Sequence, residues 1–166
     1  MRAAIVLLLL AATACGAGKR RTLQPADVSA ELGDTSGPFA ELRLAWVETG
    51  LDEYDRFFRE AAALQGALIL AERAAAGEGE PARLLPVLQA VEGRAEAALL
   101  VGQSLLGRAA TDFSHDEKKA MAIGPALHEA IGQVRDAAAR APGILARLQG
   151  GEPDAAAPTG GVRSLR

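Results

Sequence analysis

Apolar residues recur every three or four positions through the middle of the chain, which is the spacing of one face of an α-helix. The clearest stripe lies between residues 51 and 76 and consists of Tyr54, Phe57, Ala61, Leu64, Leu68 and Ala71. Asp52, Glu53 and Asp55 crowd its beginning, where negative charge stabilises the helix dipole. Glycines at positions 77 and 79 follow the stripe. The pattern predicts a helix over residues 51–76.

A second long stripe begins after Pro81, a residue that suits the first turn of a helix. Its apolar face consists of Leu84, Leu88, Val91, Ala95, Ala98, Gly102 and Leu105. Gly107 is the expected end of this helix. Ser114 and Glu117 then have the spacing of a capping box, which predicts a short helix from there to about Ala122.

Prolines divide the remaining stretch. Gly124 and Pro125 are expected to kink or restart the chain, because proline lacks a backbone N–H and its ring clashes with the preceding turn. The apolar stripe continues to Arg140 with Leu127, Ala130, Ile131, Val134 and Ala138. Pro142 is expected to interrupt the helix again, before a last apolar turn.

A shorter helix is expected over residues 38–50, where Phe39, Leu42 and Trp46 have helical spacing. No stretch shows sustained strand alternation together with hairpin turn residues. The chain is therefore expected to be all-α, a small antiparallel bundle of three long and one or two short helices within residues 38–149. The flanks contain glycine, proline and few large apolar residues, which predicts a flexible tether over 15–37 and a disordered tail over 150–166.

The first sixteen residues follow a different pattern. Arg2 precedes an apolar run from Ala3 to Ala14, which is the layout of a secretory signal. The run has about a dozen residues, fewer than the roughly 20 that a transmembrane helix needs. Cys15, directly after small residues, resembles the lipobox of bacterial lipoprotein precursors. That resemblance implies a signal peptide over residues 1–14, a diacylglyceryl group on the Cys15 thiol and an acylated N-terminus carrying a chain such as palmitate.

The residues after Cys15 indicate which membrane would hold the anchored protein. Gly16 stands where an aspartate usually marks inner-membrane retention in Gram-negative lipoproteins, so the resemblance implies an outer-membrane anchor facing the periplasm. A free thiol and an intermolecular disulfide remain alternatives for Cys15, because the chain has one cysteine. Lys19, Arg20 and Arg21 are interpreted either as contacts to anionic headgroups or as a solvated cluster.

Charge and composition narrow the possible functions. The chain has 18 basic and 21 acidic residues, a net charge of −3. Nucleic-acid binding is not expected, because it requires a basic face, and the 4% of aromatic residues offer few platforms for stacking single-stranded bases. The length allows one domain.

Candidate chemistry is sparse. Asp112 and His115 have a spacing that places two ligands on one helical face, but a di-iron bundle needs a pair of Glu-x-x-His motifs and further glutamates. We therefore predict no metal and no cofactor. The chain has no G-x-S-x-G nucleophile motif and no glycine-rich phosphate loop after a strand. We therefore expect that the chain is not an enzyme.

The aromatic residues Trp46, Tyr54, Phe57 and Phe58 are candidate partner contacts. Phe57 and Phe58 are adjacent and cannot both face one core direction on a helix, which makes one of them a candidate for exposure. An exposed aromatic residue near Trp46 would suit a partner. The alternative is a shared core wedge at one end of the bundle.

These observations predict a lipid-anchored cell-envelope protein with a non-catalytic protein-binding, structural or adaptor role. Its expected partners are the membrane, through the anchor, and another envelope protein. The alternative is a periplasmic carrier or sensor of an apolar small molecule or metal held within the bundle.

Overall fold

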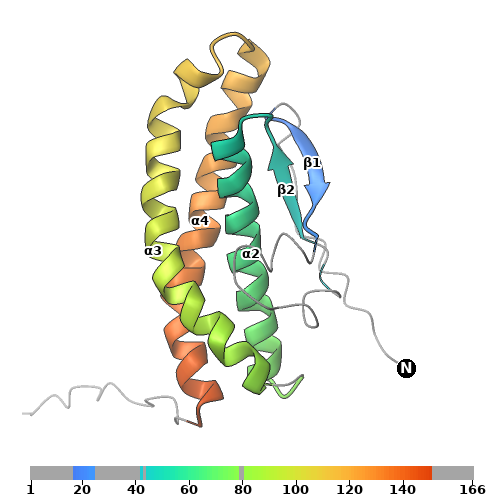
Figure 1. Cartoon of the computed structure of the whole chain (residues 1–166), viewed down its shortest axis with the longest axis vertical. Helices are drawn as coiled ribbons and strands as arrows, with labels where there is room; N and C mark the ends of the chain where they lie inside the picture. The colour runs from blue at the N-terminus through green and yellow to red at the C-terminus, as the bar shows by residue number, and fades with distance from the viewer. Residues whose placement is uncertain (1–16, 25–41, 43, 79–80, 151–166) are drawn as a thin grey trace, which may run out of the picture.

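The computed structural model describes residues 17–24, 42, 44–78 and 81–150. Within them lie three long helices packed side by side and a two-stranded sheet beside one of them (Figure 1). The elements in chain order are β1 (Lys19–Thr22), β2 (Ala45–Glu48), α2 (Asp52–Ala75), α3 (Pro81–Asp112) and α4 (Glu117–Leu148). The prediction of a mostly helical fold is confirmed, and the sheet is a feature that the sequence pattern did not predict.

Helix α2 closely matches the helix predicted over 51–76. Its first turn contains Asp52, Glu53 and Asp55, and the chain leaves it through Gly77 at a φ of 88°. Only glycine adopts this left-handed conformation without steric cost. The acidic start and the glycine end therefore define this helix, as the sequence indicates.

Helix α3 begins at Pro81 as predicted but continues past Gly107 to Asp112. Gly107 has no heavy atom within 4 Å of an added Cβ position and remains helical. Neighbouring packing holds this last turn in place, since Leu105, Ala109 and Phe113 are all buried. Burial of these side chains outweighs the helix-breaking tendency of one exposed glycine.

Helix α4 is continuous, so the predicted separate short helix, the restart of the chain at Pro125 and the interruption at Pro142 are wrong. Both prolines lie on the exposed side of α4, where water can bond the carbonyl groups that proline leaves unpaired. The predicted capping box is also wrong. Asp116 is the N-cap, and its side chain accepts a hydrogen bond of 3.1 Å from the Lys119 backbone N–H.

Strands β1 and β2 form an antiparallel pair, with Lys19 opposite Glu48 and Thr22 opposite Ala45. The prediction of a flexible tether is therefore wrong for Lys19–Thr22, and the prediction of a helix is wrong for Ala45–Glu48. Tryptophan and valine favour strands, and Trp46 is buried on the sheet rather than on a helix face. Its helical spacing from Leu42 is thus not a helix signal.

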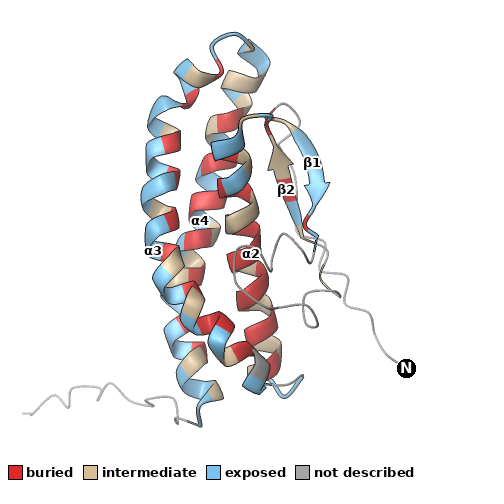
Figure 2. Ribbon diagram, in the orientation of Figure 1, coloured by how far each residue is buried: buried red, intermediate tan, exposed pale blue. Residues whose placement is uncertain are grey.

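The hydrophobic core lies between the three helices, with α2 buried along most of its length (Figure 2). The largest fully buried side chains are Tyr54, Phe57, Phe113, Leu64, Leu68, Leu88, Leu105, Ile123, Leu127, Ile144 and Val91. Gly102 of α3 faces side chains of both other helices. A Cβ there would lie 2.6 Å from Phe57 and 2.8 Å from Ile131, so a larger residue would require these side chains to shift.

Candidate functional site

The N-terminal end of the described chain is fixed in the fold almost immediately after Cys15, which itself lies outside the described residues. Ala17 is fully buried. At Gly18 an added Cβ would collide with the backbone carbonyl oxygen of Glu48. Leu23 is buried at the other end of β1, and its backbone N–H donates a 2.8 Å hydrogen bond to the Leu44 carbonyl oxygen. The segment from Ala17 to Leu23 is therefore part of the folded body.

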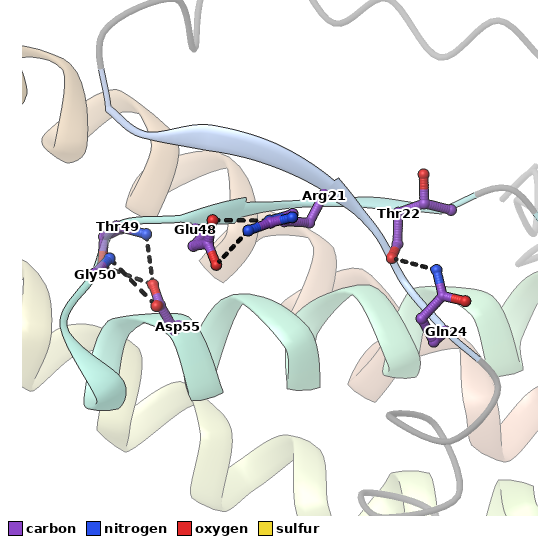
Figure 3. A network of polar contacts seen from close by, with 7 residues as sticks. All are labelled: Arg21, Thr22, Gln24, Glu48, Thr49, Gly50 and Asp55. Atoms are coloured by element: carbon purple, nitrogen blue, oxygen red, sulfur yellow. Dashed lines mark hydrogen bonds and ion pairs between the residues drawn. The ribbon is translucent and has the colours of Figure 1, made fainter.

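Between these buried ends, β1 presents Lys19, Arg20 and Arg21 at the surface. The Arg21 guanidinium donates two hydrogen bonds to the Glu48 carboxylate, at 2.8 and 3.1 Å (Figure 3). This contact raises the pKa of Arg21 and lowers the pKa of Glu48, mainly through the hydrogen bonding and with a Coulombic contribution. Glu48 also lies opposite Lys19 in the register, so it offsets part of the positive charge of the strand.

The predicted partner contacts Trp46, Tyr54, Phe57 and Phe58 are all buried. The hypothesis that one of the two adjacent phenylalanines is exposed is therefore wrong. Both are buried because α2 packs against α3 and α4 and also against β2. Within the described residues, these rings form core contacts: Tyr54 meets Phe113 edge-on at 4.9 Å, and the Phe57 and Phe58 centroids are 5.9 Å apart.

Trp46 attaches the hairpin, the antiparallel pair of β1 and β2, to α2. The Arg59 guanidinium of α2 lies 5.4 Å from the centroid of the Trp46 ring, a distance typical of a cation–π contact. The indole Nε1 is buried without a hydrogen-bond partner, and such an unpaired buried donor is costly. The ring is therefore held by packing and by Arg59.

The junction between β2 and α2 is fastened by Asp55 (Figure 3). Its carboxylate accepts hydrogen bonds from the Thr49 hydroxyl at 2.7 Å and from the Gly50 backbone N–H at 3.2 Å. Gly50 turns the chain at a φ of 84°. Leu51 at the N-cap position makes no side-chain cap bond, and Asp55 instead ties the first turn of α2 back to the turn that precedes it. In the sequence, Asp55 is recognisable only as one of the acidic residues at the helix start.

A helix-end cluster of Glu53, Tyr54, Arg108 and Asp112 joins α2 to α3. The Tyr54 hydroxyl donates to the Asp112 carboxylate at 2.8 Å and lies 3.1 Å from the Leu105 carbonyl oxygen. Arg108 forms ion pairs with Glu53 and, at 3.4 Å, with Asp112. Burial, followed by the hydrogen bond to Asp112, raises the pKa of Tyr54, so its phenol stays protonated at neutral pH. The cluster is built to hold two helix ends together.

Lys119 brings α4 to the same end of the bundle. Its ammonium group donates to the Thr49 carbonyl oxygen at 3.0 Å and lies 5.8 Å from the centroid of the Phe113 ring. The hairpin junction, the end of α3 and the start of α4 are thus linked by polar contacts.

The histidines do not join this cluster. His115 is exposed in the loop after α3, and the Nδ1 atom of His128 lies 2.9 Å from the Gly124 carbonyl oxygen within α4. Asp112, the other residue of the D-x-x-H spacing, is bonded to Tyr54. Among the described residues, no three His, Cys, Asp or Glu side chains are grouped in a way that would hold a metal ion. None of the helices in the described part of the chain is long and apolar enough to cross a membrane.

Comparison with known proteins gives no relative from which a function is transferred. No family model matches the chain, and neither the curated proteins nor the solved structures contain a match. A function for this chain is therefore argued from its own residues.

Proposed function

We propose that this chain is a lipid-anchored protein of the cell envelope, attached to the outer membrane through Cys15 and facing the periplasm. Its role is non-catalytic: it binds another protein or serves as a structural adaptor. The observation that supports the anchor is the position of Cys15 relative to the fold. The described part of the chain begins at Ala17, which is buried, so the lipobox cysteine stands two residues before a position that is packed in the fold.

This short connection determines how an anchored copy would sit. Two extended residues span at most about 7 Å, far less than a flexible tether of residues 15–37 would reach. The hairpin would therefore lie at the headgroup level. Exposed basic side chains near an anionic surface each contribute about 1 kcal/mol of attraction, and β1 offers Lys19 and its neighbours there. Arg21 contributes less, because Glu48 already pairs with it.

Membrane fractionation of the full chain tests the anchor. The wild-type chain and a Cys15→Ser variant would be expressed in a Gram-negative host, and the distribution of each between membrane and soluble fractions compared. Thr13→Ser is the matched control, because it keeps the cysteine and removes one methyl group two positions before it. We expect wild type and Thr13→Ser in the outer-membrane fraction and Cys15→Ser lost from it.

Equal partition of wild type and Cys15→Ser between the membrane and soluble fractions would contradict both the anchor and the envelope location. Membrane association lost in high salt but retained in Cys15→Ser would assign the attachment to the basic strand rather than to an acyl chain, because exposed charge interactions are screened by salt.

A further inference from the structure

The chain is packed almost immediately after the bond at which the signal peptide is expected to be cut. That bond joins Ala14 to Cys15, and Ala17, the third residue after it, is fully buried. A Cβ added at Gly18 would overlap the Glu48 carbonyl oxygen, so the two backbones lie close together there. From Ala17 onwards, the chain is therefore engaged with the fold.

A peptidase needs the residues on both sides of the bond that it cuts to be accessible. Proteases prefer exposed segments, and they cut a folded chain from the state in which the segment around the bond has opened. Cleavage adds one water molecule across the amide between Ala14 and Cys15: the hydroxyl group joins the Ala14 carbonyl carbon, and the proton joins the Cys15 nitrogen. An enzyme that encloses this bond also needs room for the residues just after it, where Ala17 is buried.

Strand β1 is placed so that it can separate while the helices keep their packing. Its main contacts are with β2, and β2 in turn packs on α2 (Figure 1). All four residues of β1 are exposed, and the buried residues beside it are Ala17 and Leu23. Opening of β1 therefore uncovers these two side chains and leaves the contacts between the three helices in place.

The contacts that hold β1 on β2 are weak. The side chains of the Arg21–Glu48 ion pair are 48% and 33% exposed, and ion pairs in contact with water contribute little to stability. A two-stranded hairpin with strands of four residues is at most marginally stable by itself. We therefore expect β1 to open far more often than the helices unfold.

We propose that β1 is separated from β2 while the bond before Cys15 is cut, and that it pairs with β2 only afterwards. This inference rests on the proposed lipid anchor, and it adds an order of events: cleavage comes first and closure of β1 second. The rate at which a folded precursor is cut is then set by the fraction of chains in which β1 is open. The hairpin thus couples the processing of the chain to the completion of its fold.

Closure of β1 changes how far the folded body can lie from the membrane. With β1 open, the residues from Gly16 to Leu23 form an extended connection of up to about 28 Å, which leaves room for an enzyme between the body and the bilayer. With β1 closed, the connection shortens to the two residues before Ala17, at most about 7 Å. Closure therefore draws the body towards the headgroups.

A disulfide across the hairpin tests the requirement for opening. The Leu23 backbone N–H donates to the Leu44 carbonyl oxygen, so in this register Arg20 and Val47 form a pair without ladder hydrogen bonds. The Cα atoms of such a pair are about 4.5 Å apart, within the range that a disulfide spans. The double variant Arg20→Cys, Val47→Cys therefore holds β1 closed when oxidised and releases it when reduced.

The full uncleaved chain of this double variant, made by cell-free synthesis in detergent, is incubated in each redox form with inner membranes of a Gram-negative host. Peptide mapping establishes that positions 20 and 47 are joined and that the Cys15 thiol is free, and intact mass measures the removal of residues 1–14. We expect the oxidised form to be cut at least about tenfold more slowly than the reduced form. The wild-type chain, treated identically, is the control and should be cut at the same rate in both conditions.

Gly18→Ala provides the opposite change, because its methyl group would overlap the Glu48 carbonyl oxygen and favour the open form of β1. We expect this variant to be cut several-fold faster than wild type in the same assay. Thr22→Val, an exposed change in the same strand, is the matched control and should be cut at the wild-type rate. Circular dichroism establishes that both variants remain helical.

Limited digestion with trypsin measures the opening of β1 without the lipid anchor. Trypsin cuts after lysine and arginine, and β1 contains Lys19, Arg20 and Arg21. We expect cuts within β1 to be faster than wild type in Gly18→Ala. In the double variant, cuts after Lys19 and Arg21 should be suppressed by oxidation and restored by reduction.

Equal cleavage before Cys15 in the oxidised and reduced double variant would overturn this order of events and leave the anchor in place. Trypsin cuts in β1 that ignore the disulfide, or a Gly18→Ala chain cut before Cys15 at the wild-type rate, would also overturn it. A wild-type chain that membranes neither cut nor acylate would contradict the anchor and the order together, even where trypsin shows that β1 opens. The failure of this inference and the failure of the anchor are therefore distinguishable.

Discussion

A single residue, Tyr54, stabilises the fold through its buried hydroxyl group. The hydroxyl bonds the Asp112 carboxylate, so it ties the start of α2 to the end of α3. Burial and this hydrogen bond raise the pKa of Tyr54 above its ordinary value of 10.0. Because the folded state favours the protonated phenol, the stabilisation is complete below the unfolded pKa and is lost as pH rises towards the folded pKa.

We predict that the free energy of unfolding falls as pH rises above about 10 and that Tyr54→Phe removes this part of the fall. At neutral pH the variant should lose about 1 kcal/mol, the typical contribution of a hydrogen bond. Urea unfolding at increasing pH measures both effects. Tyr54 is the only tyrosine, so its phenolate absorbance reports the pKa directly. An ordinary pKa in the folded chain would contradict the burial of this hydroxyl.

Gly102 is the second residue on which the packing depends. We predict that Gly102→Ala destabilises the protein by about 1–3 kcal/mol, because its methyl group would overlap Phe57 and Ile131. Gly132→Ala on the exposed side of α4 is the control, since nothing lies near its added Cβ and alanine favours helix by up to about 1 kcal/mol. We expect the melting temperature to fall in Gly102→Ala and to rise in Gly132→Ala. A stabilising Gly102→Ala would show that the three helices do not meet there.

At the scale of elements, the hairpin is the part that sequence patterning misses. Lys19, Arg20 and Arg21 show no alternation of apolar and polar residues, and β2 has only four residues. Their pairing joins segments far apart in the chain, so no local pattern encodes it. Helices α2 and α3 were predictable because their apolar stripes are long and periodic.

We predict that Gly18→Ala detaches the hairpin while the helices remain, because the added methyl group would overlap the Glu48 backbone carbonyl. Trp46 is the only tryptophan and is buried between hairpin and helix, so its fluorescence reports the docking. Emission should be blue-shifted in wild type and move to the red in Gly18→Ala. Thr22→Val, an exposed change in the same strand, should leave it unchanged. A red-shifted Trp46 emission in the wild-type protein would contradict the docking of the hairpin on α2.

Helix α4 contradicts a local rule, because two prolines lie inside it. Proline costs about 3 kcal/mol in a helix interior, and packing of α4 against α3 and α2 compensates for that cost. We predict that Pro125→Ala stabilises the protein by about 1–3 kcal/mol. Pro81→Ala is the control, since Pro81 occupies the first position of α3, where proline is tolerated. Urea unfolding measures the stability of both variants. A Pro125→Ala variant with the stability of wild type would contradict a continuous α4.

At the scale of the whole molecule, the hairpin and α3 flank α2 on different sides (Figure 1). An anchor at Cys15 would therefore hold the hairpin side at the membrane, with α3 on the other side of α2. The anchor follows from a sequence resemblance alone, whereas the position of the hairpin beside α2 needs the structure.

The aromatic residues also show what helical periodicity does not report. Their clustering was visible in the sequence, but the burial of Phe58 depends on β2 covering a second side of α2. Whether a helix is covered on one side or two is a property of the tertiary arrangement, and helical periodicity does not report it.

The intact mass of the protein extracted from membranes tests the lipid anchor. We expect a chain that lacks residues 1–14, begins at Cys15 and carries the added mass of a diacylglyceryl group and an acyl chain. A full-length mass without any acyl group would contradict the anchor, and with it the proposed location at the outer membrane.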